Sequence, residues 1–187
     1  RLIGFLGPSF HDRSTYMHSL LYDNQKPEEQ GKDFVDQILG CVLPMTAKSQ
    51  KETFQALVEE TLGEECDYET VRTIHDTLNE MIEEQKDEPE PLKLDKTDVK
   101  RVFEQSGVSN EALEQFDHHY GELAGEEVSF VASNVVNARK FEIRTPDVIV
   151  QVNPERTDLV ETKTVDGKKC LVIQLSDEVE VNGISIK

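Results

Sequence analysis

Short runs in which apolar and polar residues alternate fill the C-terminal part of the chain, from Arg139 to Lys187. A period of two is typical of β-strands that bury one face, and turn-forming residues separate the runs. The strongest turn signal is Asp166-Gly167, because both residues tolerate the positive φ of a two-residue type I′ turn. This pair predicts a hairpin in which Val165 lies opposite Lys168. We therefore expect an antiparallel β-meander in this part of the chain.

The register of that hairpin assigns its residues to two faces, because successive side chains of a strand point to opposite sides. The more apolar face, which we expect to be buried, carries Val160, Thr162, Leu171 and Ile173. The opposite face carries Glu161, Lys163, Cys170 and Val172. Further alternating rows precede the hairpin, so the strands are numerous enough for a sheet that a second layer covers.

The middle of the chain has a helical period. Between residues 27 and 125, apolar residues recur every three or four positions, which predicts about five helices. Asp67, Asp95 and Ser109 precede such stretches and are residue types that cap helix N-termini. An acidic stretch with two prolines, residues 83–91, interrupts the period and predicts a solvated hinge.

Two further strands are predicted before the helices, at Leu2–Leu6 and Tyr16–Tyr22. The order of strands, helices and strands is typical of an α+β fold rather than of an alternating parallel α/β fold. We expect three parts. They are residues 1–26, whose strands pack with the C-terminal sheet, the helical residues 27–125, and the meander of residues 126–187.

The chain is strongly acidic, since 38 aspartate and glutamate residues stand against 20 lysine and arginine residues, which leaves a net charge of −18. Nucleic acid binding needs clustered cations, and the same repulsion opposes an anionic membrane surface, so we expect neither partner. No apolar run reaches the roughly 18 residues of a membrane-spanning helix. The sequence therefore predicts a cytoplasmic protein.

The cysteines and histidines form no metal or cofactor motif. Cys41, Cys66 and Cys170 are far apart and odd in number, which is typical of reduced cytoplasmic thiols and excludes a thiolate zinc site. His118 and His119 are adjacent, whereas two metal ligands on one helix normally lie at positions i and i+4. The glycine-rich nucleotide motifs are absent as well, so we expect no metal and no cofactor.

The loop from Ser9 to Thr15 has the densest collection of chemically active side chains in the sequence. The candidates for binding there are His11, Asp12, Arg13, Ser14 and Thr15. Arginine and hydroxyl groups can hold a carboxylate or phosphate through charge-assisted hydrogen bonds. The same residue types also stabilise turns, so a purely structural loop is the alternative. The residues of the meander that are candidates to complete such a site are Asn153, Glu155 and Arg156.

Several long runs of the chain are specific for one family. They are FHDRST with the following HSLLY, QKETFQALVEETLGEEC, LNEMIEE with DEPEPL, SNVVNARKFE with TPDVIVQVNPER, and DLVETKTVDGKKCLVIQL ending in VEVNGI. Through these runs the whole chain resembles the C-terminal half of a bacterial, mostly Firmicutes, family catalogued as domain of unknown function forty-three seventeen. The resemblance implies no activity and transfers no site residue. Members of that family are longer at the N-terminus, which agrees with a start at Arg1 and suggests that an N-terminal part is missing.

These observations favour a non-catalytic binding or interaction module for a protein partner, with the sheet as scaffold and the helical segment Pro27–Gly125 as the contact surface. The alternative is an enzyme or a small-anion binder that uses residues 9–15. This alternative requires the loop to converge with Asn153 or Arg156 on one concave pocket, because small ligands bind in concave sites with a few polar groups.

Overall fold

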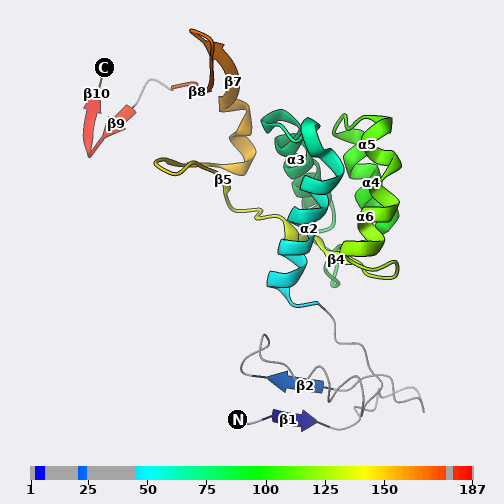
Figure 1. Ribbon diagram of the computed structural model, residues 1–187. Helices are drawn as coiled ribbons and strands as arrows, with labels where there is room; N and C mark the ends of the chain where they lie inside the picture. The colour runs from blue at the N-terminus through cyan, green and yellow to red at the C-terminus, as the bar shows by residue number, and fades with distance from the viewer. Residues whose placement is uncertain (1–2, 7–20, 25–44, 176–178, 187) are drawn as a thin grey trace. The chain divides into compact units, whose positions relative to one another are not determined.

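The structure, a computed structural model, describes residues 3–6, 21–24, 45–175 and 179–186 (Figure 1). The chain divides into two compact units, Arg1–Thr46 and Ala47–Lys187. In the first unit, β1 (Ile3–Leu6) pairs antiparallel with β2 (Leu21–Asn24). The strand predicted at the N-terminus is thus confirmed as β1.

The other sequence predictions for the first unit are tested less fully. The strand predicted at Tyr16–Tyr22 overlaps β2 in its last two residues, and its earlier residues lie outside the described ranges. The helix expected to begin at Pro27 and the polar loop of residues 9–15 also lie outside them. Packing of these strands with the C-terminal strands stays a prediction.

The second unit begins with a helical body. Its α-helices are α2 (Ala47–Leu62), α3 (Tyr68–Glu84), α4 (Lys96–Gln105), α5 (Asn110–Glu114), α6 (Phe116–Leu123) and α7 (Ala132–Val135). A 3₁₀ turn, η2 (Gly63–Glu65), joins α2 to α3, and the short strand β3 (Lys93–Leu94) pairs with β4 (Phe130–Val131). The helix expected after Ser109 is two helices, α5 and α6, which meet at Gln115.

The helix starts lie where the capping residues predict them. The Asp67 carboxylate accepts a hydrogen bond from the backbone N–H of Thr70, at 2.9 Å. Asp95 forms a full capping box with Asp98, in which each side chain accepts from the other residue's N–H. The Ser109 hydroxyl caps α5 by accepting a hydrogen bond from the backbone N–H of Ala112, at 3.2 Å. Each such cap contributes about 1 kcal/mol by satisfying an N–H group that the helix leaves unpaired.

The hydrophobic core lies among these helices. Its most deeply buried residues include Leu57, Leu78, Leu94, Val99, Val102, Phe103, Phe116, Tyr120 and Phe130. Aromatic rings meet edge to face inside it, Phe54 with Phe130 at a centroid distance of 5.7 Å and Phe103 with Phe116 at 5.5 Å. Such pairs contribute about 0.5–1.5 kcal/mol each beyond the area that they bury.

The acidic stretch with two prolines, residues 83–91, lies at the end of α3 and in the connector that follows it. Residues 83–91 are all exposed, and turns and bends follow the end of α3 at Glu84. The prediction that this stretch is solvated is therefore confirmed. The stretch is not extended, however, because Glu83 and Glu84 still belong to α3 and turns and bends follow them, and a hinge motion stays a prediction.

The C-terminal strands pair two by two as antiparallel hairpins. They are β5 (Phe141–Arg144) with β6 (Ile149–Val152), β7 (Val160–Val165) with β8 (Lys168–Ile173), and β9 (Val179–Val181) with β10 (Ile184–Ile186). A 3₁₀ segment, η3 (Pro154–Leu159), connects β6 to β7. Helices together with antiparallel strand pairs confirm the α+β class. Among the described residues, each hairpin is its own two-stranded sheet.

The central hairpin has the register that its turn predicts. Val165 lies opposite Lys168, and Val160 lies opposite Ile173. Asp166 and Gly167 have φ values of 50° and 75°, which are the positive angles that a type I′ turn requires. The sequence signal for this turn is therefore confirmed.

The expectation that one face of this hairpin is buried is wrong for most of its length. Val160 is 1% exposed, but Leu171 is 38% and Ile173 is 45% exposed. The reason is the position of α3, which packs against β7 and covers the start of that strand. The register was determined by the turn, whereas burial depended on the contact with α3, which covers Val160 on β7 and leaves its partner Ile173 on β8 exposed.

Candidate functional site

An apolar groove opens between α2, α3 and the segment that leads into β5. Its volume is about 420 Å³, and Phe54, Val58, Val71, Ile74, Leu78, Val135, Val136 and Phe141 form its apolar lining. Polar side chains at its margin include Lys51, Glu59, His75 and Lys140. Eight of the sixteen lining residues are apolar, and Glu142 is a second acid at the margin, so the groove combines an apolar wall with a polar rim, as sites for small ligands or single side chains do.

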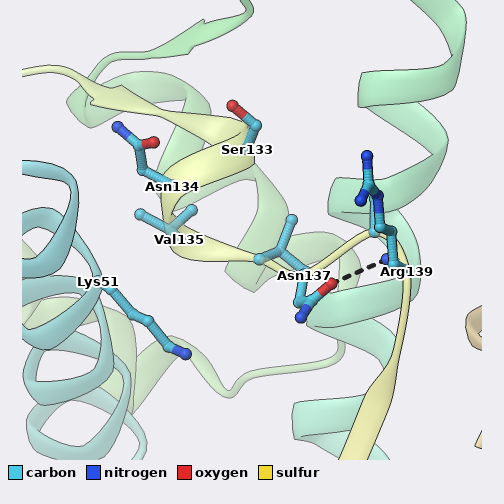
Figure 2. Close-up of a pocket in the computed structure, with 8 residues that line it drawn as sticks. Lys51, Ser133, Asn134, Val135, Asn137 and Arg139 are labelled. Carbon is cyan, nitrogen blue, oxygen red and sulfur yellow. Dashed lines mark hydrogen bonds between the residues drawn. The ribbon is translucent and has the colours of Figure 1, made fainter.

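A second, more polar pocket adjoins the groove. Figure 2 shows it between α2, which carries Lys51, and the segment from Ser133 to Arg139. Its volume is about 410 Å³, and it shares four lining residues with the groove: Lys51, Val135, Val136 and Asn137. The two cavities are therefore neighbours on the same face of the helical body.

Side-chain hydrogen bonds from α2 hold the wall of this polar pocket in place. The side-chain oxygen of Gln50, which is itself buried, accepts hydrogen bonds from the backbone N–H of Val131 at 2.8 Å and from the amide of Asn134 at 3.3 Å. These bonds tie α7 to α2. Further along, the side-chain oxygen of Asn137 accepts from the backbone N–H of Arg139 at 2.9 Å.

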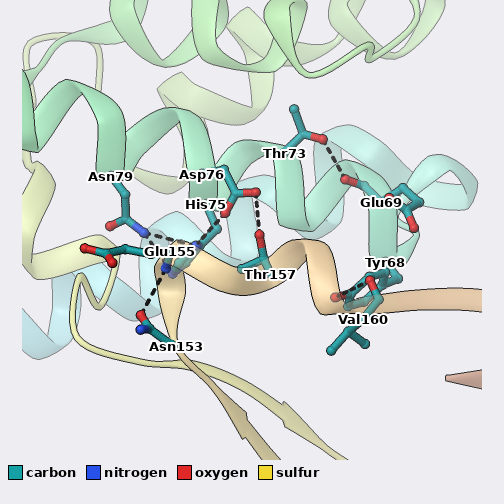
Figure 3. A network of polar contacts seen from close by, with 10 residues as sticks. All are labelled: Tyr68, Glu69, Thr73, His75, Asp76, Asn79, Asn153, Glu155, Thr157 and Val160. Carbon is teal, nitrogen blue, oxygen red and sulfur yellow. Dashed lines mark hydrogen bonds and ion pairs between the residues drawn. The ribbon is translucent and has the colours of Figure 1, made fainter. Parts of the chain in front are cut away.

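A polar network fastens the base of the central hairpin to α3. In Figure 3, the Thr157 hydroxyl donates to the Asp76 carboxylate at 2.8 Å, and the Tyr68 hydroxyl donates to the carbonyl of Val160 at 3.4 Å. The side chain of His75 is only 12% exposed, and its ring meets Phe141 edge to face at 4.8 Å. His75 is therefore a packed side chain at the edge of the apolar face of α3.

The hairpins beyond this network carry exposed apolar side chains. Large hydrophobic residues that are exposed from Val148 onward are Val148, Ile149, Val165, Leu171, Ile173, Leu175, Val181, Ile184 and Ile186. In β8, Leu171 and Ile173 share one face because they are two positions apart. We call these two residues, with the adjoining Leu175, the hairpin surface. Leu175 lies directly beyond the strand and is 70% exposed.

Two of the three candidate site residues from the C-terminal part of the chain, Asn153 and Arg156, have partners within their own turn. Asn153 caps η3, since its side-chain oxygen accepts from the backbone N–H of Glu155 at 3.1 Å. The Arg156 guanidinium pairs with Asp158 at 3.0 Å, and this hydrogen bond is the main cause that lowers the pKa of Asp158. Both residues therefore act locally.

The remaining candidates, His11, Asp12, Arg13, Ser14 and Thr15, lie outside the described residues. Their convergence with Asn153 or Arg156 stays a prediction.

The residues of the polar pocket were not predicted from the sequence. The run from Ser133 to Arg139 contains a serine, two asparagines and an arginine within seven positions, which is a signal comparable to that of the N-terminal loop. The sequence could not show that Lys51, more than eighty positions earlier on another helix, faces this run.

The described cysteines and histidines do not form an activated centre. Cys66 and Cys170 are free thiols. Partial burial, and then the carboxylates of Glu59 and Asp67, raise the pKa of Cys66, so this thiol stays protonated near neutral pH. In the part of the chain that the structure describes, no three histidine, cysteine or acidic side chains gather as metal ligands would.

No helix within the described ranges combines the length and the apolar content that crossing a membrane requires.

Comparison with known proteins identifies one family. The family described as Domain of unknown function (DUF4317) matches residues 2–184, which is essentially the whole chain. No curated protein and no solved structure matches the chain. The chain belongs to the DUF4317 family, and the resemblance seen in the long sequence runs is confirmed.

Proposed function

We propose that this member of the DUF4317 family is a non-catalytic protein-binding module of the bacterial cytoplasm, and that its hairpin surface is the contact surface. The observation that carries the proposal is the exposure of Leu171 and Ile173, side by side on one face of β8. Exposed apolar side chains that gather in one place mark interaction surfaces in folded proteins. This moves the contact surface from the helical segment, where the sequence placed it, to the strands.

The backbone of the hairpin supports the same proposal. Within the described residues, β7 pairs only with β8 and β8 only with β7, so each strand has a second edge with unpaired N–H and C=O groups. Such edges accept an added strand from a partner, in which main-chain hydrogen bonds supply affinity and alternate side chains supply specificity. A two-stranded hairpin alone is only marginally stable, and an added strand would stabilise it.

The charge of the chain determines which partner we propose. Two copies of a chain with a net charge of −18 repel each other, whereas a cationic segment is attracted and reaches the surface faster. The proposed partner is therefore an extended protein segment in which basic and apolar residues alternate.

Two further observations support a binding role over catalysis and a cytoplasmic location. The raised pKa of Cys66 is opposite to what a catalytic thiol needs. Cys66 and Cys170 are free thiols, which suits a reducing compartment.

The test is fluorescence anisotropy with a labelled peptide of alternating lysine and valine. A peptide of alternating lysine and serine has the same charge and serves as the ligand control. We expect the valine peptide to bind more tightly, and we expect Ile173→Ser to weaken its binding about tenfold, because one buried large side chain contributes about 1.5–3 kcal/mol.

The matched protein control is Val165→Ser, since Val165 is exposed to a similar degree but lies on the opposite face of the same hairpin. This variant should bind the valine peptide as the wild type does. Equal binding of both peptides, or equal loss in both variants, would contradict the proposal. The alternative is that a second copy of the chain binds the hairpin surface, and analytical ultracentrifugation tests it. A dimer that dissociates in the Ile173→Ser variant would support this alternative and contradict the proposal.

A further inference from the structure

The polar pocket between α2 and the segment Ser133–Arg139 has an unusual lining for this chain. Its charged residues are Lys51 and Arg139, and none of its eight lining residues is an acid. Acidic residues outnumber basic ones 38 to 20 in the whole sequence, so a cavity whose charged lining residues are all cations is contrary to the overall composition.

Both cations of the pocket are available to a ligand. Several basic residues elsewhere in the described ranges form ion pairs, among them Lys96 with Asp117, Lys100 with Asp117, Lys140 with Glu142, and Arg156 with Asp158, whereas Lys93 and Lys168 form none with a described residue. Lys51 and Arg139 form no ion pair with any described residue. Both residues line the cavity, but in Figure 2 the Lys51 amine and the Arg139 guanidinium point in different directions, so Arg139 has to turn towards Lys51 before both can hold one anion with charge-assisted hydrogen bonds.

The neutral polar groups of the pocket also suit an anion. The Asn137 side-chain oxygen is occupied by the N–H of Arg139, which leaves its amide nitrogen as a donor. Ser133, which also lines the pocket, is exposed and carries a hydroxyl. The hydrogen bonds from Val131 and Asn134 to Gln50 hold α7, and with it Ser133, against α2, which lowers the entropy that binding costs at that side of the pocket.

The neighbouring groove indicates the chemical character of the part of the ligand beyond its anionic head. A bare oxyanion is much smaller than the 410 Å³ of the polar pocket, and the pocket continues into the apolar groove of about 420 Å³ along Val135 and Val136. A ligand whose anionic head lies at Lys51 and Arg139 therefore meets Phe54 and Val58 with its remainder. Those side chains favour a hydrocarbon tail.

We propose that the two adjoining cavities form one binding site for a carboxylate that carries an apolar tail. Lys51 and Arg139 hold the carboxylate, the amide of Asn137 donates to it, and the tail enters the groove between α2 and α3. The site is separate from the hairpin surface and does not depend on the proposed protein-binding function.

The experiment is a calorimetric titration of the protein with hexanoate, with acetate as the short homologue and hexanamide as the uncharged homologue. Sodium chloride at equal ionic strength controls for screening. We expect hexanoate to bind at least tenfold more tightly than acetate, because each buried methylene contributes about fourfold in affinity. Hexanamide should bind more weakly than hexanoate, since it lacks the charge.

The variant for the test is the double substitution Lys51→Gln and Arg139→Gln. Both side chains are exposed, so the fold should keep its thermal midpoint, while hexanoate affinity should fall at least about tenfold through the loss of charge-assisted bonds. The matched control is Lys93→Gln with Lys168→Gln, which changes the net charge equally at two exposed cations outside the pocket. This control should bind hexanoate as the wild type does.

A second pair of ligands separates the two sources of such a carboxylate. One is an acetylated tripeptide that ends in leucine with a free C-terminus, and the other is the same peptide with a C-terminal amide. Tighter binding of the free acid peptide than of hexanoate would assign the site to a protein C-terminus, and the reverse order would assign it to a free acid. No binding of either carboxylate, or equal affinity in both double variants, would overturn the proposal.

Discussion

Tyr120 combines complete burial with a single strong hydrogen bond. Its side chain lies in the aromatic core, and its hydroxyl donates to the carbonyl of Val128 at 2.6 Å. Burial, and then the carboxylates of Asp95, Asp98 and Glu126, raise the pKa of Tyr120 to about 12. The folded state therefore favours the neutral phenol, because burial and the nearby negative charges disfavour the phenolate. The neutral hydroxyl also donates the hydrogen bond to Val128.

This raised pKa predicts a loss of stability in alkali. An unperturbed tyrosine ionises near pH 10, so between about pH 10 and pH 12 the unfolded state releases a proton that the folded state retains. The contribution is fully present below pH 10 and is lost as the pH rises. We expect Tyr120→Phe to reduce this alkaline loss and to lower the free energy of unfolding at pH 7 by about 1 kcal/mol, the usual value of one hydrogen bond.

The measurement is urea unfolding, followed by circular dichroism, at a series of pH values for wild type and Tyr120→Phe. Other groups titrate in the same range, so only the difference between the two proteins is informative. Parallel pH profiles for the two would show that Tyr120 ionises equally in the folded and unfolded states.

Among the secondary-structure elements, α4 is the one whose start the chain specifies most completely. The Asp95 carboxylate accepts from the N–H of Asp98 at 2.9 Å, and the Asp98 carboxylate accepts in return from the N–H of Asp95 at 3.3 Å. The buried residues Val99, Val102 and Phe103 follow within the same helix. The cap therefore fixes where α4 begins, and from that start Val99, Val102 and Phe103 face the core.

We expect Asp95→Ala to lower the free energy of unfolding by about 1 kcal/mol, within the range measured for N-cap substitutions. Asp87→Ala removes the same charge from the exposed connector and is the matched control, with an expected change near zero. Chemical denaturation of both variants checks the prediction. A loss of equal size in the control would assign the effect to net charge rather than to the cap.

On the scale of the whole molecule, charge decides which partners are compatible with the chain. The net charge of −18 creates a repulsive field for polyanions, while the two cations of the polar pocket act only at short range, because salt screens exposed charges beyond about 10 Å. A compact monovalent anion can therefore occupy the pocket although an extended polyanion is repelled.

This contrast predicts that the protein does not bind duplex DNA. We expect no shift of a labelled duplex in an electrophoretic assay at low salt, where cationic proteins bind most tightly. The double variant with Lys51→Gln and Arg139→Gln should behave in the same way. Binding by the wild type that weakens as salt is added would contradict the prediction and would point to a cationic surface in the residues that the structure does not describe.

The sequence by itself determined the local features of this protein. The Asp166-Gly167 turn set the register from Val165 and Lys168 onward, and Asp67, Asp95 and Ser109 marked helix starts. These features depend on backbone angles and on hydrogen bonds between residues that are a few positions apart, so the residue types specify them directly.

Only the tertiary structure decided which faces are buried and which residues meet. Leu171 and Ile173 have the pattern of a buried row, yet α3 covers the start of β7 at Val160 and leaves both of these β8 residues exposed. Lys51 and Arg139 carry no signal in common, and they line one pocket because Gln50 binds α7 to α2. Burial and pocket formation depend on how distant elements pack, and periodicity indicates that a face is apolar without indicating what covers it.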